Sequence, residues 1–86
     1  DEHSRVVGNA LRGLYEAGIP ASVAKIQGML RHTDPQRQAT AFWVAGTTGD
    51  TRFLNTLEGL LPAVSGRLRG HVLKAVRAIQ ERKGEI

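Results

Sequence analysis

The side chains that could carry catalysis or hold a metal are three histidines scattered along the chain. His3, His32 and His71 lie far apart, and none stands at helical spacing from an acidic residue. The sequence contains no cysteine, which excludes disulfides, zinc–thiolate sites and thiol nucleophiles. Catalysis and metal binding require titratable groups that converge, and the spacing does not indicate such a group. We therefore expect no enzymatic activity, no metal and no cofactor.

A glycine-rich stretch at residues 46–50, Gly-Thr-Thr-Gly-Asp, invites comparison with a phosphate-binding loop. It lacks the Gly-Lys-Ser/Thr element of such loops, and it follows a predicted helix instead of a strand. His32 also stands at a predicted helix end, where an imidazole interacts favourably with the helix dipole. Both features therefore predict the ends of helices and not sites of chemistry.

Five helical segments are predicted to position these side chains, over residues 4–17, 21–31, 34–47, 50–62 and 65–83. Apolar residues recur at helical spacing in the first segment, and Gly18 follows it as a left-handed cap. Asp34-Pro35 begins the third segment, because aspartate accepts hydrogen bonds from free backbone N–H groups and proline presets the dihedral angle. Hairpin turns and period-two alternation are missing. The sequence therefore predicts an all-α fold of five helices.

The pattern of residues recurs at a constant repeat interval, which is the separation of Ala10 from Ala41. The other identical pairs at this interval are Gly18 and Gly49, Gly28 and Gly59, and Leu30 and Leu61. A second shift by the same interval places apolar or small residues at 41, 42 and 44 over residues of the same kind at 72, 73 and 75. A helix–turn–helix unit thus occurs about two and a half times, which is typical of helical solenoids. Each such unit is stable only when it is stacked on its neighbours.

Residues 34–50, DPQRQATAFWVAGTTGD, resemble the first helix and turn of a short bacterial HEAT-like repeat. Segments 9–18 and 68–79 resemble the same part of that unit. Arg37 and Thr48 depart from the aliphatic residues that the family usually has there. The resemblance implies a right-handed α-α superhelix of about two and a half helical hairpins, and a scaffold that binds other macromolecules. A small independent helical bundle is the competing fold.

The whole chain, residues 1–86, is predicted to form a single domain. It is 41% hydrophobic and 23% charged, which is too apolar for a disordered chain. The first helix lacks the polar outer face of a solenoid cap. We therefore expect either a domain excised from a longer protein or a homodimer that covers this open end. No apolar run is long enough to span a membrane and no signal-peptide pattern is seen, so we expect a cytoplasmic protein.

Trp43 is the residue whose type and position most indicate binding. Its repeat column also contains Arg12 and Lys74, so the column is predicted to face solvent. An exposed tryptophan buries a large area at low entropic cost and is a frequent hot spot of protein interfaces. The alternative is a packing role, in which the indole folds over Phe42 or a neighbouring helix.

Two further surfaces are candidates for binding. The second helices of the units are expected to present Lys25, Arg31 and Glu58, and this mixture of signs suits a protein partner. Residues 65–86 hold six basic and two acidic side chains, whereas residues 1–64 are balanced. The last helix is therefore the alternative site, for nucleic acid, through its cluster of basic residues Arg67, Arg69, Lys74 and Arg77. The leading prediction is a non-catalytic protein–protein interaction or scaffolding module.

Overall fold

The computed structural model describes residues 2–84, and the elements in that range are helical. The α-helices are α1 (Glu2–Glu16), α2 (Ala21–Leu30), α3 (Pro35–Thr48), α4 (Leu54–Leu60) and α5 (Gly66–Gly84). Short 3-10 turns at Thr51–Phe53 and Leu61–Ala63 flank α4. No strand occurs between residues 2 and 84. The predicted all-α fold of five helices is confirmed.

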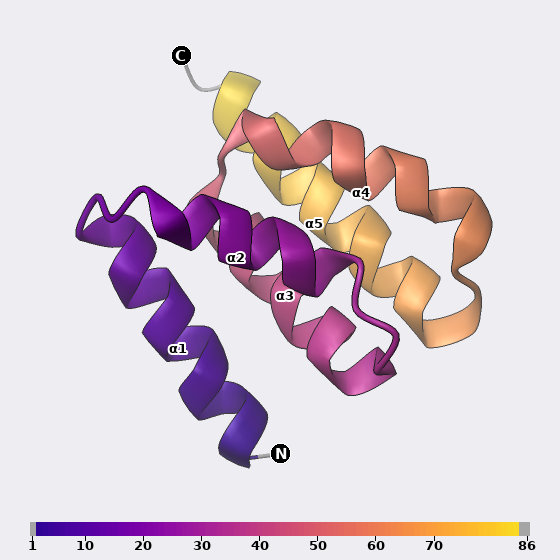
Figure 1. The fold of residues 1–86 in the computed structure, drawn as a ribbon. Coiled ribbons are helices and arrows are strands. Elements are labelled where there is room, and N and C mark those ends of the chain that lie inside the picture. The colour runs from indigo at the N-terminus through magenta and orange to yellow at the C-terminus, as the bar shows by residue number, and fades with distance from the viewer. Residues whose placement is uncertain (1, 85–86) are drawn as a thin grey trace.

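The helices are arranged in two layers. Helix α3 lies between α1 and α5 and packs against both, while α2 and α4 form a second layer across them (Figure 1). Helix α2 packs mainly on α3, and α4 packs mainly on α5. The molecule measures 33 × 33 × 19 Å, and its short dimension matches two helices, each about 10 Å in diameter. No helix within the described range has the length and apolar character needed to cross a bilayer.

The ends of the helices follow from capping residues that the sequence indicates. The Asp34 carboxylate accepts a hydrogen bond from the Gln36 backbone N–H at 3.1 Å, and Pro35 occupies the first turn of α3. Gly18 and Gly49 adopt left-handed φ angles of 77° and 68° after α1 and α3. Glycine adopts this conformation without the steric cost that a Cβ atom brings. The predicted caps at Gly18 and Asp34 are therefore confirmed, and Gly49 ends α3 within the glycine-rich stretch that predicts a helix end.

The fourth helical segment is less regular than predicted. In place of one helix over residues 50–62, the chain forms a 3-10 turn, the short helix α4 and a second 3-10 turn. Pro62 lies in the first turn of the second 3-10 segment and has no N–H to donate to an α-helical carbonyl. The α-helical pattern therefore ends at Leu60.

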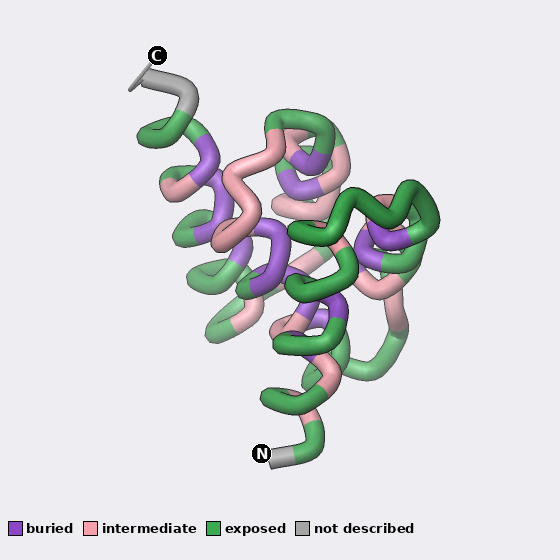
Figure 2. The backbone as a smooth tube through the Cα atoms, turned by 90° about the vertical axis from the view of Figure 1, so that its left-hand side faces the viewer, coloured by how far each residue is buried: buried purple, intermediate pink, exposed green. Residues whose placement is uncertain are grey.

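The hydrophobic core lies between the two layers, as the buried segments in Figure 2 show. Phe42, Phe53, Ile26 and Leu57 are among its fully buried side chains. Burial of a large apolar side chain contributes about 1.5–3 kcal/mol, so this interface between the layers is the main source of stability. Phe42, next to Trp43 in the sequence, is thus a core residue.

Several pairs of positions at the repeat interval have matching surroundings. Ile26 and Leu57 are both 0% exposed. The Gln38 side-chain amide donates to the Leu30 carbonyl oxygen at 3.0 Å, and the Arg69 guanidinium donates to the Leu61 carbonyl oxygen at 3.1 Å. Donor and acceptor are both displaced by one repeat interval. In each case, the start of a first-layer helix satisfies a free carbonyl near the end of the preceding second-layer helix.

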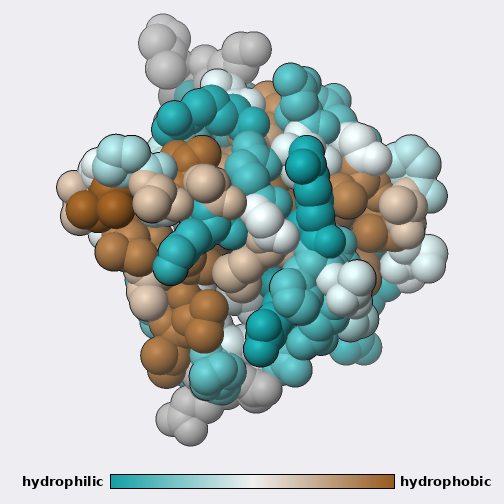
Figure 3. All heavy atoms as spheres, viewed as in Figure 1, coloured by the Kyte–Doolittle hydropathy of each residue, from teal (hydrophilic) through white to brown (hydrophobic). Residues whose placement is uncertain are grey.

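The two outer helices of the first layer leave apolar side chains in solvent. Val6 and Leu14 of α1 are 61% and 40% exposed, and Leu73 of α5 is 45% exposed. Figure 3 shows apolar surface on the side where α1 runs. Leu73 shares its repeat column with Leu11 and Phe42, which are buried. Leu73 itself lies on the side of α5 that faces away from α3, the neighbouring helix of its layer. A homodimer or a further segment that covers α1 stays a prediction.

A polar network ties α1 to the loop after α3. The Tyr15 hydroxyl donates to the Asp50 carboxylate at 2.7 Å, and the Arg52 guanidinium approaches the same carboxylate at 2.6 Å. The Asp50 carboxylate also accepts from the Arg52 backbone N–H at 2.9 Å. The hydrogen bonds from Arg52 lower the pKa of Asp50 to about 2. The charged form of Asp50 therefore stabilises the fold.

The stability of the protein is expected to depend on this carboxylate in acid. Because folding lowers the pKa of Asp50 from 3.8 to about 2, its contribution is present above pH 4 and is lost as the pH falls towards 2. A shift of this size corresponds to on the order of 2 kcal/mol. Asp50→Asn keeps an acceptor but removes the charge, and should lose less stability over the same range. Urea unfolding curves at several pH values test this, and equal losses in the two proteins would contradict it.

Candidate functional site

A groove of about 660 Å³ opens on the first layer between α1, α3 and α5. Small residues of α3 and α5 form much of its lining: Ala39, Gly46, Ala75 and Ala78. A Cβ atom on Gly46 would lie 3.2 Å from the Cα atom of Ala75. The two helices therefore approach closely at this point because neither has a bulky side chain there. The volume falls within the range of ligand-binding clefts, roughly 300–1,000 Å³.

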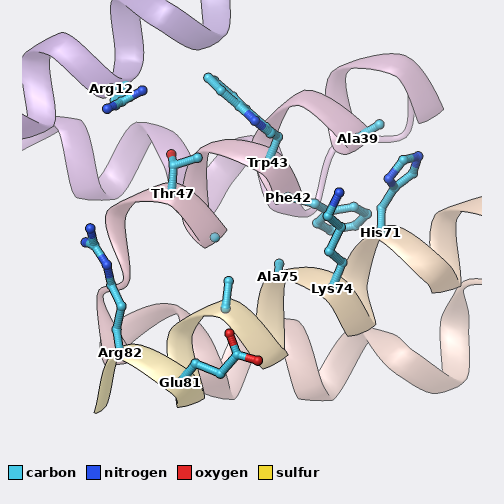
Figure 4. Close-up of a pocket in the computed structure, with 12 residues that line it drawn as sticks. Arg12, Ala39, Phe42, Trp43, Thr47, His71, Lys74, Ala75, Glu81 and Arg82 are labelled. Atoms are coloured by element: carbon cyan, nitrogen blue, oxygen red, sulfur yellow. The ribbon is translucent and has the colours of Figure 1, made fainter. Parts of the chain in front are cut away.

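Trp43 stands at the edge of the groove with 47% of its surface exposed. A Cβ atom on Gly8 of α1 would lie 3.3 Å from the six-membered ring of the indole, so one edge of the ring packs on α1. Figure 4 shows the indole between Arg12 on one side and His71 and Lys74 on the other. The tryptophan therefore combines a fixed edge with a free surface. The indole is thus partly exposed, as its repeat column predicts, and partly packed against a neighbouring helix, as in the alternative.

Trp43 also borders a second hollow of about 500 Å³ between α1 and α3. Arg5, Asn9 and Thr40 are among its lining residues, and Ala39 and Trp43 line both hollows. The indole is therefore accessible to a ligand from more than one direction. A ligand that lies across the first layer would meet it on the way from α1 to α5.

Basic side chains surround the groove. Arg12 comes from α1, whereas Lys74 and Arg82 come from α5. Glu81 is the one carboxylate among the lining residues of the described chain. The Arg12 Nε donates to Glu16 at 3.0 Å, and the Arg82 guanidinium donates to the Thr48 carbonyl oxygen at 3.1 Å. These contacts hold both arginine side chains beside the groove.

The sequence-predicted protein-binding residues lie on two different layers. Trp43 belongs to the first layer. Lys25 lies on α2, Arg31 directly follows that helix, and Glu58 lies on α4, and all three are exposed. None of these three lines the groove. The structure thus separates Trp43 from the charged residues of the second layer, which line neither of the two hollows beside it.

The residues of the alternative nucleic-acid site are exposed along α5. Of the four, Lys74 alone lines the groove. Arg69 directs its guanidinium to the Leu61 carbonyl oxygen. Arg67 and Arg77 lie outside the groove. These four basic residues therefore lie in different surroundings and do not line one common hollow.

Sequence reasoning missed the groove as a unit, although part of its signal was present. Arg12, Trp43 and Lys74 follow one another at the repeat interval, and the structure brings all three to one hollow. Arg82 and His71 lie outside this column. Their position beside the groove depends on the close approach of α3 and α5 at Gly46, and helical periodicity alone does not specify that approach.

Comparison with protein-family models, with curated proteins and with solved structures finds no match to this chain. No group of three or more histidine, aspartate or glutamate side chains in the described part of the chain is placed to hold a metal ion.

Proposed function

We propose that this chain is a non-catalytic protein-binding module built from HEAT-like helical repeats, and that the groove around Trp43 is its binding surface. The observation that carries this proposal is the half-exposed indole at the edge of a hollow with a small-residue lining. A tryptophan at such a place offers a large, rigid contact area to a partner. The small residues beside it let the backbone of the partner approach closely.

The arrangement of the helices supports the repeat part of the proposal. Helix α3 separates α1 from α5, and α2 and α4 occupy corresponding places in the other layer. The hydrogen bonds of Gln38 and Arg69 and the buried positions 26 and 57 match at the repeat interval. Solenoids of stacked helix pairs have this character. The proposed architecture is a right-handed superhelix of about two and a half units.

A selection from a displayed library of random short peptides tests the binding function. The immobilised protein is expected to enrich peptides that lose at least about tenfold in affinity for the Trp43→Ala variant, as is usual for a tryptophan hot spot. Trp43 is the only tryptophan of the chain, so its fluorescence reports directly on occupancy of the groove. The enriched peptides should change its emission in a saturable manner.

Leu73→Ala is the matched control for this experiment. Leu73 is 45% exposed against 47% for Trp43, but it lies outside the groove. Its replacement should leave peptide affinity unchanged. Both variants should keep their helical circular dichroism, because neither removes a fully buried side chain. Enriched peptides that bind the Trp43→Ala variant as well as the original protein would contradict the proposed site.

A further inference from the structure

The charges around the groove are unequal. Arg12, Lys74 and Arg82 line it together with the single described carboxylate of Glu81. Arg5 lines the second hollow, between α1 and α3, which Trp43 also borders. A ligand that passes Trp43 therefore meets basic groups along its path from α1 to α5. The positive potential favours a partner with negative charge.

The basic groups differ in how free they are to meet a ligand. Lys74 is exposed, and no other described residue forms a hydrogen bond or ion pair with its side chain. Arg82 donates to the neutral carbonyl of Thr48, which positions the guanidinium, and no carboxylate among the described residues forms an ion pair with it. Arg12 shares its charge with Glu16 through one exposed contact. Lys74 and Arg82 are therefore the main source of the field, and both belong to α5.

Most of the remaining lining of the groove is apolar, and Thr47 and His71 are its polar members. Phe42 lies beneath the groove, fully buried, and the small residues Ala39, Ala75 and Ala78 leave room beside the indole. Such a surface accepts an aliphatic or aromatic side chain better than a sugar–phosphate backbone. A single indole also falls short of the successive aromatic residues on which single-stranded nucleic acids stack.

We propose that the groove binds an acidic segment of a partner protein, with an apolar side chain beside Trp43 and carboxylates directed to Lys74 and Arg82. This inference rests on the proposed binding function and specifies the chemistry of the partner. Charge complementarity selects the segment and accelerates its encounter with the groove. Contact with the indole and the small residues then supplies the buried apolar area.

The composition of the peptides selected on the protein tests the inference. Peptides whose binding depends on Trp43 are expected to be enriched in aspartate and glutamate relative to the input library. A synthetic peptide of this set should bind at least about tenfold more weakly when its carboxylates are replaced by amides. Its affinity should also fall as salt is raised, because screening weakens exposed charge pairs.

Charge reversal identifies the basic groups that act. Lys74→Glu is expected to weaken the acidic peptide at least about tenfold, as charge repulsion replaces attraction. Lys25→Glu is the matched control, since it makes the same change of charge at an exposed position on α2, outside the groove. It should change the affinity by less than about twofold, because distant exposed charges are screened.

The outcomes separate this inference from the proposed function. Trp43-dependent peptides without an acidic bias would overturn the inference and leave the groove as a binding surface. A selection that yields no Trp43-dependent peptide would overturn both. An oligothymidylate that shifts Trp43 emission at a lower concentration than the selected acidic peptides would assign the groove to nucleic acid, and would also overturn the acidic-segment inference.

Discussion

Replacement of Phe42 by alanine is expected to lower the free energy of unfolding by about 3–5 kcal/mol. Phe42 is 0% exposed and belongs to the core between the layers. Truncation would remove its buried ring and leave a cavity that the packed helices fill only in part. A domain of 86 residues has a total stability of roughly 4–13 kcal/mol, so the variant would lose a large fraction of its stability. Urea denaturation followed by circular dichroism measures the change.

Leu73→Ala provides the comparison for this prediction. Leu73 follows Phe42 by one repeat interval, but it is 45% exposed on the outer side of α5. Its replacement should cost less than about 1 kcal/mol, as is usual for surface positions. Similar costs at the two positions would mean that the layers do not pack as described, because α3 would then not be the central helix.

The second large effect is expected from Gly46→Leu. A Cβ atom at this position would lie 3.2 Å from the Cα atom of Ala75 and 3.5 Å from its Cβ atom. A leucine must therefore push α3 and α5 apart, and overpacking of this kind costs about 1–3 kcal/mol. The same side chain would also occupy the groove. The variant should thus lose both stability, measured by urea denaturation, and peptide binding, measured by Trp43 fluorescence.

Gly59→Ala is the control for the glycine substitution. Gly59 lies on α4 and is exposed, and a Cβ atom added to it would meet no atom of another element within 4 Å. Alanine is favoured over glycine in a helix by up to about 1 kcal/mol, so this variant should be more stable than the original. A gain of stability in Gly46→Leu as well would show that α3 and α5 are not in close contact.

Local signals in the sequence were sufficient to predict the helices and most of their ends. Asp34 and Gly49 act within one turn of their own positions, so their capping roles can be inferred without knowledge of the fold. The 3-10 turn that contains Pro62 was missed because helical periodicity continues through it, while the hydrogen-bonding pattern changes. Sequence periodicity describes which side chains share a face, and it does not describe how each carbonyl is satisfied.

The burial of the outer helices was harder to predict. Leu11, Phe42 and Leu73 occupy one repeat column, yet only the first two are buried. A column gives the direction of a side chain on its helix, whereas burial also requires a neighbouring helix on that side. The position of Arg82 beside the groove was hard to predict for a related reason, because it depends on the spacing between α3 and α5. Contacts between helices far apart in the sequence therefore limited the prediction of the site.

The most direct test of the binding surface is a backbone amide chemical-shift titration of the isotope-labelled protein with a peptide selected on it. We expect the largest shifts in α3 and α5 around Trp43 and Lys74, with smaller shifts in α1 near Arg12. The exposed residues of the second layer, Lys25 and Glu58, should be unaffected. The largest shifts on α2 and α4, with none around Trp43, would contradict the account and move the binding surface to the second layer.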